Sequence, residues 1–221
     1  MKIRAVLLSW VCLSAACGCA RIAQPVSVAQ FRASLLPTLV ATKIQTPLYL
    51  VVSESEVPDR VHVTGMQIAI FTVPDLDLVQ VRTFATRDLK HALESYFAHV
   101  NLIFDPAQLP STPHLRGDVR LTKIEYQRQI SAGYRGQQNE LFGAVEWAFG
   151  IKVSSQADFV YKFSERTISA RQMTSFSDVS EFESAFEEAL RHLLADYDRS
   201  GMHARLLAGE AASTLAPAPA P

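Results

Sequence analysis

The chain has 221 residues, of which 48% are hydrophobic and 19% charged, and its formal net charge is −1. These proportions are typical of a globular protein and exclude a largely disordered chain. The lysines and arginines form no basic stripe, so the electrostatic attraction that nucleic-acid binding needs has no support. We therefore expect no nucleic-acid partner.

The first residues have the order of a secretory signal peptide. Lys2 and Arg4 precede an apolar run from Ala5 to Ala16 that ends in small residues. This run is well below the roughly 20 residues that a membrane-spanning helix needs. We therefore predict a signal peptide over residues 1–16.

Two cysteines follow the apolar run. Ser-Ala-Ala precedes Cys17, and Ala-Cys-Gly precedes Cys19. A cysteine directly after small residues resembles the lipobox of bacterial lipoproteins, in which the thiol receives a diacylglycerol and the new amino terminus is acylated. We predict that one of the two is lipidated and prefer Cys17, because its preceding residues are all small and it meets the end of the run. The alternative is an ordinary secretory peptide whose cysteines are removed or form disulfides.

Composition divides the rest of the chain into three parts. Residues 17–46 mix small, polar and proline positions, which indicates a tether with room for a short helix. Residues 47–206 carry the periodic apolar patterns of a domain, and because no cysteine lies in them they contain no disulfide. Residues 207–221 end in Ala-Pro-Ala-Pro-Ala-Pro and lack bulky apolar side chains, so we expect a disordered tail.

The first half of the domain predicts strands around one helix. Short apolar runs predict strands over residues 48–52 and 66–73. A three- and four-residue spacing of apolar positions predicts an amphipathic helix over residues 88–100. A short strand at 101–104 and a proline-containing loop at 105–117 follow.

The second half predicts longer strands. Apolar positions change parity within residues 119–126, so we predict a β-bulge near Thr122-Lys123, where one extra residue restores the buried face. The polar, glycine-containing segment 131–140 is predicted to be a loop. Strict alternation over 145–163 would make a strand of roughly 60 Å, so we predict a break at 154–156.

The last elements complete a two-layer fold. A further strand at 167–176 is predicted to pair with the preceding one through a turn at 164–166. A helix is predicted to begin at Ser180, which together with Glu183 fits a capping box, and Gly201 is a plausible stop. The sequence therefore predicts an α+β domain, with a mostly antiparallel sheet and two amphipathic helices packed on one face.

The residues with reactive side chains form no enzyme signature. The chain has no Gly-x-Ser-x-Gly elbow and no phosphate-cradling glycine loop. No two of its six histidines have the spacing that would let them bind one metal ion from the same face of a helix. The acidic residues at the start of the last helix are explained by the positive end of the helix dipole. We expect no catalytic residue, no cofactor and no metal site.

One aromatic series has two interpretations. The alternating residues can be core, or they can line an apolar groove between sheet and helices that holds an acyl chain or a partner strand. The candidate groove residues are Trp147, Phe149, Phe159, Tyr161 and Phe163.

The order of motifs resembles a known family. Pro47-Leu48-Tyr49-Leu50 after the tether, the stretch from Ile68 to Leu76 with its proline, and Val79-Gln80-Val81-Arg82 are similar to segments of the ABC-type transport auxiliary lipoproteins. The helices and strands that follow fall in a similar order, and the resemblance covers residues 47–197.

This resemblance implies a non-catalytic accessory lipoprotein of Gram-negative envelope lipid transport, with a protein partner in an ABC-linked or inter-membrane complex. The residue after either cysteine, Gly18 or Ala20, is not aspartate, so by analogy with enteric sorting we expect the outer membrane, with the domain facing the periplasm. The alternative is an assembly or plug lipoprotein for an outer-membrane β-barrel, as in lipopolysaccharide export, with segments 105–117 and 131–142 as probes.

Overall fold

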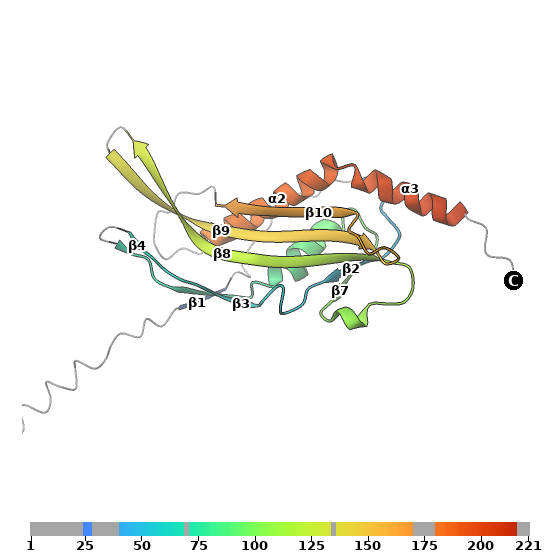
Figure 1. Ribbon diagram of the computed structural model, residues 1–221, viewed down its shortest axis with the longest axis horizontal. Coiled ribbons are helices and arrows are strands. Elements are labelled where there is room, and N and C mark those ends of the chain that lie inside the picture. Colours follow the sequence, from blue (N-terminus) through green and yellow to red (C-terminus); the bar gives the residue numbers. More distant parts are fainter. Residues whose placement is uncertain (1–23, 28–39, 69–70, 134–135, 170–179, 216–221) are drawn as a thin grey trace, which may run out of the picture.

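A five-stranded sheet forms the centre of the molecule (Figure 1). The computed structural model describes residues 24–27, 40–68, 71–133, 136–169 and 180–215. The strands lie in the spatial order β10 (Tyr161–Ile168), β9 (Gly136–Val153), β8 (Leu115–Gly133), β2 (Leu48–Val51) and β7 (Val100–Ile103). β8, β9 and β10 are antiparallel neighbours, whereas β2 is parallel to both β7 and β8. The fold is α+β, as the sequence predicts.

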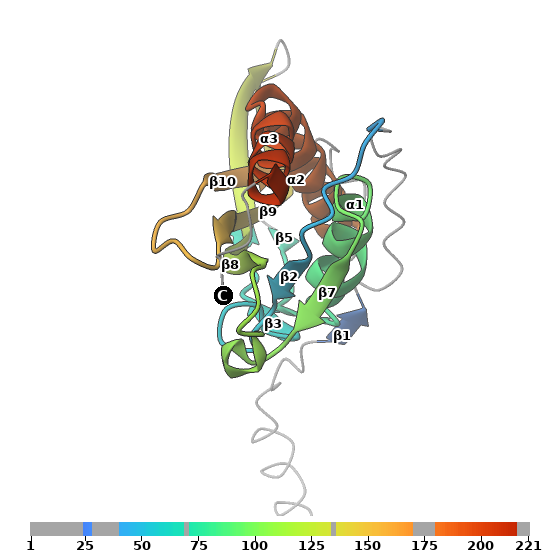
Figure 2. The ribbon, with the colours of Figure 1, turned by 90° about the vertical axis from the view of Figure 1, so that its right-hand side faces the viewer.

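The helices cover one face of this sheet (Figure 2). They are η2, a π-helix at Phe84–Leu89, α1 (Lys90–Leu93) and α2 (Ser180–Arg199). The predicted apolar face of the last helix is confirmed, because every member is buried: Phe182, Phe186, Ala189, Leu190, Leu193, Leu194 and Tyr197. Burying this face against the sheet is what stabilises a helix of this kind.

The first helix is shorter than predicted and begins earlier. The helical backbone runs from Phe84 to Leu93, not over 88–100. The apolar residues predicted to share its face are all buried, but the later ones join the sheet instead. Phe97 forms a parallel bridge with Ile44, and Val100 pairs with Leu48. Sheet hydrogen bonds therefore replace helical ones at the end of the segment.

A small second sheet lies beside the main one. Its order is β1 (Gln24–Ser27), β6 (Leu76–Val79) and β3 (Arg60–Val63), with β1 parallel and β3 antiparallel to β6. β1 falls inside the segment 17–46 that was predicted to be a tether. Its four residues pair with the open edge of β6, which satisfies backbone groups that a tether would leave to water.

The predicted strand at 66–73 is instead a short hairpin. β4 (Gln67–Ile68) pairs with β5 (Phe71–Thr72) in antiparallel register, with Gln67 opposite Thr72. A continuous apolar run does not by itself distinguish one strand from two that fold back on each other.

The β8–β9 pair is longer than predicted. The β-bulge at 122–123 is confirmed, since the register shifts between Leu121 and Lys123. The segment 131–140, predicted to be a loop, continues the ladder until Gly133 faces Gly136. The backbone N–H and C=O groups of each strand pair with those of the other strand. The ladder can therefore extend through a polar sequence without an apolar face to bury.

The predicted break at 154–156 is also confirmed, because β9 ends at Val153. The strand that pairs with β9 after this break is β10, at Tyr161–Ile168. The predicted turn at 164–166 is therefore wrong, because these residues lie within β10, and most of the predicted strand at 167–176 lies outside the described residues. The alternating apolar residues up to 163 thus include the first residues of β10.

The chain continues as a helix beyond the predicted domain end. Gly201, with a φ of 65°, separates α2 from α3 (Met202–Leu215). Most of α3 lies in the segment 207–221 that was predicted to be disordered. Leu206 and Leu207 pack against the core, and alanine, leucine and glutamate favour helix. The signal peptide at 1–16 and both cysteines, Cys17 and Cys19, lie outside the described residues. Within the described ranges, no helix is long and apolar enough to cross a bilayer.

Candidate functional site

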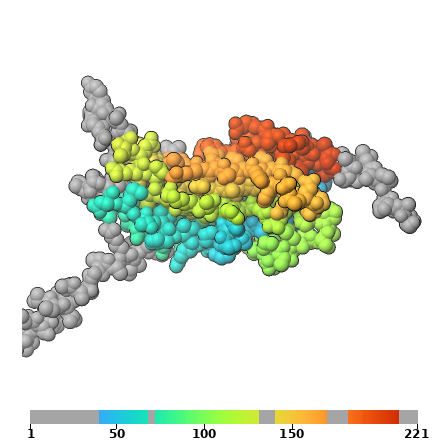
Figure 3. Space-filling model, in the orientation of Figure 1, coloured from blue at the N-terminus to red at the C-terminus, as the bar shows by residue number. Residues whose placement is uncertain are grey.

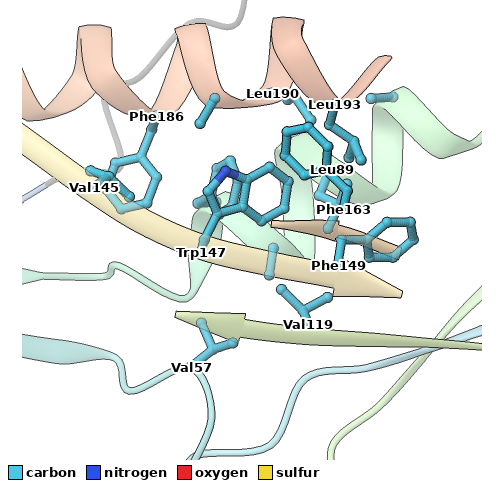
Figure 4. Close-up of a cluster of buried hydrophobic side chains, with 14 of the residues drawn as sticks. Val57, Leu89, Val119, Val145, Trp147, Phe149, Phe163, Phe186, Leu190 and Leu193 are labelled. Atoms are coloured by element: carbon cyan, nitrogen blue, oxygen red, sulfur yellow. The ribbon is translucent and has the colours of Figure 1, made fainter. Parts of the chain in front are cut away.

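The aromatic series that was a candidate groove is largely core (Figure 4). Trp147 and Phe149 are 1% and 2% exposed, and Tyr161 and Phe163 are also buried. Trp147 lies between β9 and the helices, with its ring centroid 5.0 Å from that of Phe84 and 5.6 Å from that of Phe163.

These contacts place the four buried residues in the core, which is one of the two predicted interpretations of the series. Side chains of α2, including Phe186 and Leu190, occupy the space over the sheet in which an acyl chain would lie. Edge-to-face aromatic pairs such as Trp147–Phe84 add to the stability that burial alone provides. The side of the row that faces the helices is therefore filled by α2 and stabilises the fold.

Phe159 is the exception, because it lies on the opposite face of the sheet. Its ring covers Gly150, where an added Cβ would stand 2.6 Å from the ring. The ammonium groups of Lys152 and Lys162 lie 5.0 Å and 5.2 Å from its centroid. Cation–π attraction of this kind holds a partly exposed ring in place.

Figure 3 shows this outer face, where β10, β9 and β8 lie side by side in orange, yellow and green. Phe159 lines a hollow of about 580 Å³ on it, together with Phe149 and Phe163. Strands β8, β9 and β10 form its floor, and the segments after β2 and β7 contribute Ser53, Glu56 and Pro106 to its side. Of the segments predicted as probes of partner binding, 105–117 thus lies at this hollow.

The charged side chains around the hollow form ion pairs, with cations in excess of carboxylates. Arg116 and Lys152 lie 2.6 Å and 3.3 Å from Asp118, and Arg120 donates to Glu56 at 3.0 Å. Partly exposed pairs like these add little stability each. They do place both signs of charge on this face, which favours specific recognition of a polar partner.

A larger hollow, which the sequence analysis missed, lies under α3. This distal groove has a volume of about 1050 Å³ and runs between α3, the start of β8 and the end of β9. Its apolar lining is Ile44, Leu115, Val153, Val160, Met202, Leu206 and Leu207, and its polar lining includes Arg205 and Glu210. Three of its lining residues, Leu207, Gly209 and Glu210, lie in the segment that was predicted to be a disordered tail.

Glu210 fastens α3 to the body beside this groove. Its carboxylate accepts hydrogen bonds from the backbone amides of Gln45, at 3.1 Å, and Thr46. Burial raises the pKa of Glu210, but these hydrogen bonds outweigh it, so the pKa lies below its ordinary value. The ionised form therefore holds the helix against residues 45 and 46.

Five of the six histidines, which are spread over the fold, contact carboxylate or backbone oxygens. His62 lies 2.9 Å from Asp77, and His192 lies 2.5 Å from Glu165 and 3.0 Å from Glu188. In the part of the chain that the structure describes, no group of three or more His, Cys, Asp or Glu residues could hold a metal ion. The described residues thus offer two hollows at which a partner could be recognised.

Comparisons with known proteins add no function. No model of a protein family matches the chain, and no curated protein matches it. The crystal structure of protein XCC0632 from Xanthomonas campestris, of family DUF330, has a TM-score of 0.49 and 17% identity over 86% of this chain and 99% of that one. A protein from Helicobacter pylori, described as a neuraminyllactose-binding hemagglutinin homolog, has a TM-score of 0.44 and 10% identity over 81% of this chain and 98% of that one. Neither similarity carries an argument about function.

Proposed function

We propose that the chain is a lipid-anchored, periplasm-facing accessory subunit of an envelope lipid-transport system, held in the outer membrane by Cys17 or Cys19. The observation that carries the proposal is the lipobox-like sequence before these cysteines, followed by a single α+β domain. An accessory role of this kind needs an anchor and a surface for a partner. It needs no catalytic group.

The packing of the domain supports an accessory role over that of a lipid carrier. A carrier needs an apolar space for acyl chains, and here the aromatic row around Trp147 is packed by α2. The surface instead offers the charged outer hollow and the distal groove. Both suit contact with a protein, since apolar centres with polar surroundings are typical of protein interfaces.

The test is recovery of partners from membranes. Tagged protein is extracted in mild detergent and purified, and the proteins that accompany it are identified. We expect ABC-transport or substrate-binding components with the wild type, and their loss with the double variant Cys17→Ala/Cys19→Ala. Cys12→Ala is the matched control, because that cysteine lies in the predicted signal peptide and is removed with it. Unchanged recovery with the double variant would contradict the proposal.

A role in the assembly of an outer-membrane β-barrel is the second candidate. The observation that favours it is the long β8–β9 hairpin, whose ladder extends beyond the residues paired with β10 and β2. A hairpin of this length could reach into a barrel lumen. Recovery of a barrel protein in the same experiment, in place of transport components, would favour this candidate.

A further inference from the structure

The position of β1 fixes where the membrane anchor meets the domain. β1 is parallel to β6, with Gln24 opposite Leu76, so the chain enters the small sheet at the beginning of β6. β3 is antiparallel to β6 and ends at Val63, which pairs with Leu76. β1 therefore begins at the end of the small sheet where β3 stops and β4 and β5 follow.

The connection from the cysteines to this point is short. Five residue steps separate Cys19 from Gln24, and seven separate Cys17 from Gln24. At about 3.5 Å for each extended residue, the reach is roughly 17 Å or 25 Å. A tether extending to Pro47 would instead reach roughly 100 Å. With β1 in the sheet, the domain has little freedom to move away from its anchor.

Four exposed residues in and beside the β4–β5 hairpin are uncharged. They are Thr64, Gln67, Thr72 and Pro74, which we call the anchor-side face. The nearby carboxylates have internal partners: Asp75 accepts from the amide of Gly65 at 2.7 Å, and Asp77 lies 2.9 Å from His62. The surface thus places few uncompensated negative groups where they would meet anionic lipid headgroups.

The opposite end carries α3 and the distal groove. In Figure 1, β4 and the small sheet lie towards one end of the long axis, and α3 lies at the other. The walls of the groove are α3 and the strand ends at Leu115 and Val153, remote from the entry of β1. Tethering one end of such a domain directs the other end away from the membrane.

We infer that the anchor-side face lies against the lipid surface, and that α3 and the distal groove point into the periplasm. This orientation rests on the proposed lipid anchor. It identifies the lipid bilayer as the occupant of the anchor-side face and leaves the distal groove open to a partner protein.

The test is a proximity measurement on the full-length, lipidated protein. A fluorescent amino acid is encoded at Thr64, Thr72 or Ala208, all exposed. The protein is reconstituted into phosphatidylethanolamine–phosphatidylglycerol vesicles that carry a short-range nitroxide quencher on lipid headgroups. We expect loss of fluorescence at Thr64 and Thr72, and no loss at Ala208.

A longer tether provides the matched control. Twenty Gly/Ser residues inserted between Ala20 and Arg21 add a flexible span of roughly 25 Å, so quenching at Thr72 should fall to the level at Ala208. Equal quenching at all positions in protein that floats with the vesicles would overturn the orientation and leave the anchor intact. Protein that does not float with the vesicles would overturn the lipid anchor and the orientation together.

Discussion

Tyr161 of β10 donates its hydroxyl hydrogen to Asp196 of α2 across 2.9 Å, and so joins the edge of the sheet to the end of the helix. Tyr197 packs edge-on against it, with ring centroids 5.4 Å apart. Burial, followed by the bond to Asp196, raises the pKa of Tyr161, and burial also raises the pKa of Tyr197. The folded state is therefore more stable when the hydroxyl groups of Tyr161 and Tyr197 are neutral.

The first prediction concerns alkaline stability. A raised pKa gives stability that is present below the unfolded value, about 10 for tyrosine, and is lost as the pH rises above it. Tyr161→Phe should lower the free energy of unfolding by about 1.5 kcal/mol at pH 7, the loss of a hydrogen bond to a charged group. It should also reduce the slope of stability against pH above 10.

Urea denaturation at pH 7 and at pH values from 9 to 11 measures both effects. Tyr49→Phe, on β2 and outside this cluster, is the control. A Tyr161→Phe variant with the alkaline slope of the wild type would show that Tyr161 does not contribute to it.

The second prediction concerns the buried aromatic row. Trp147→Ala should lower the free energy of unfolding by about 3–5 kcal/mol, because it leaves a cavity among Phe84, Phe163 and Phe186. Ile168→Ala, at a side chain that is 41% exposed, should cost less than about 1 kcal/mol. Small stability loss with Trp147→Ala, accompanied by loss of lipid binding, would restore the groove hypothesis.

The third prediction concerns Gly150 and Phe159. Gly150→Ala alone should destabilise the protein by about 1 kcal/mol, since its new Cβ displaces the Phe159 ring from 2.6 Å. In a Phe159→Ala background the same change should stabilise by about 0.4–1 kcal/mol, because alanine restricts the unfolded chain. Denaturation of the four proteins in this double-mutant cycle checks the change of sign. Additive effects of the two substitutions would show that the position of the Phe159 ring does not require glycine at residue 150.

The fourth prediction concerns the attachment of α3. Glu210→Ala should remove the acceptor for the amides of Gln45 and Thr46 and weaken the docking of α3 by about 1.5 kcal/mol. The lowered pKa of Glu210 gives stability that is present above its unfolded value of about 4.5 and lost as the pH falls below it.

Amide hydrogen exchange of α3 and of residues 45 and 46 measures this docking. Exchange should be faster with Glu210→Ala at pH 7, and in the wild type the protection of α3 should decrease below pH 4.5. Glu210→Gln keeps the shape of the side chain and removes the charge, so it should give an intermediate result. Unchanged protection with alanine would place the attachment elsewhere, on Leu206 and Leu207.

Elements with a strong pattern were predictable from the sequence. The bulge at 122–123 followed from a change of parity, which has few structural explanations when one face is buried. The long helix α2 followed from seven apolar positions on one face, all of which are buried. In these cases the local pattern and the tertiary packing favour the same structure.

Elements defined by distant partners were not predictable. β1 depends on the free edge of β6, about fifty residues later in the chain. The outer half of the β8–β9 hairpin depends on mutual backbone pairing, and α3 on contacts with the core and residues 45 and 46. The distal groove exists only when these parts meet, so no single segment contains a signal for it.

Incorporation of labelled palmitate tests the central claim, lipidation at Cys17 or Cys19, most directly. Cells that express the wild type, Cys17→Ala, Cys19→Ala or the double variant are labelled, and the protein is isolated from membrane and soluble fractions. The account predicts label in the wild-type protein at the membrane, its loss in one single variant, and a soluble, unlabelled double variant. A double variant that is still labelled or still membrane-bound would contradict it.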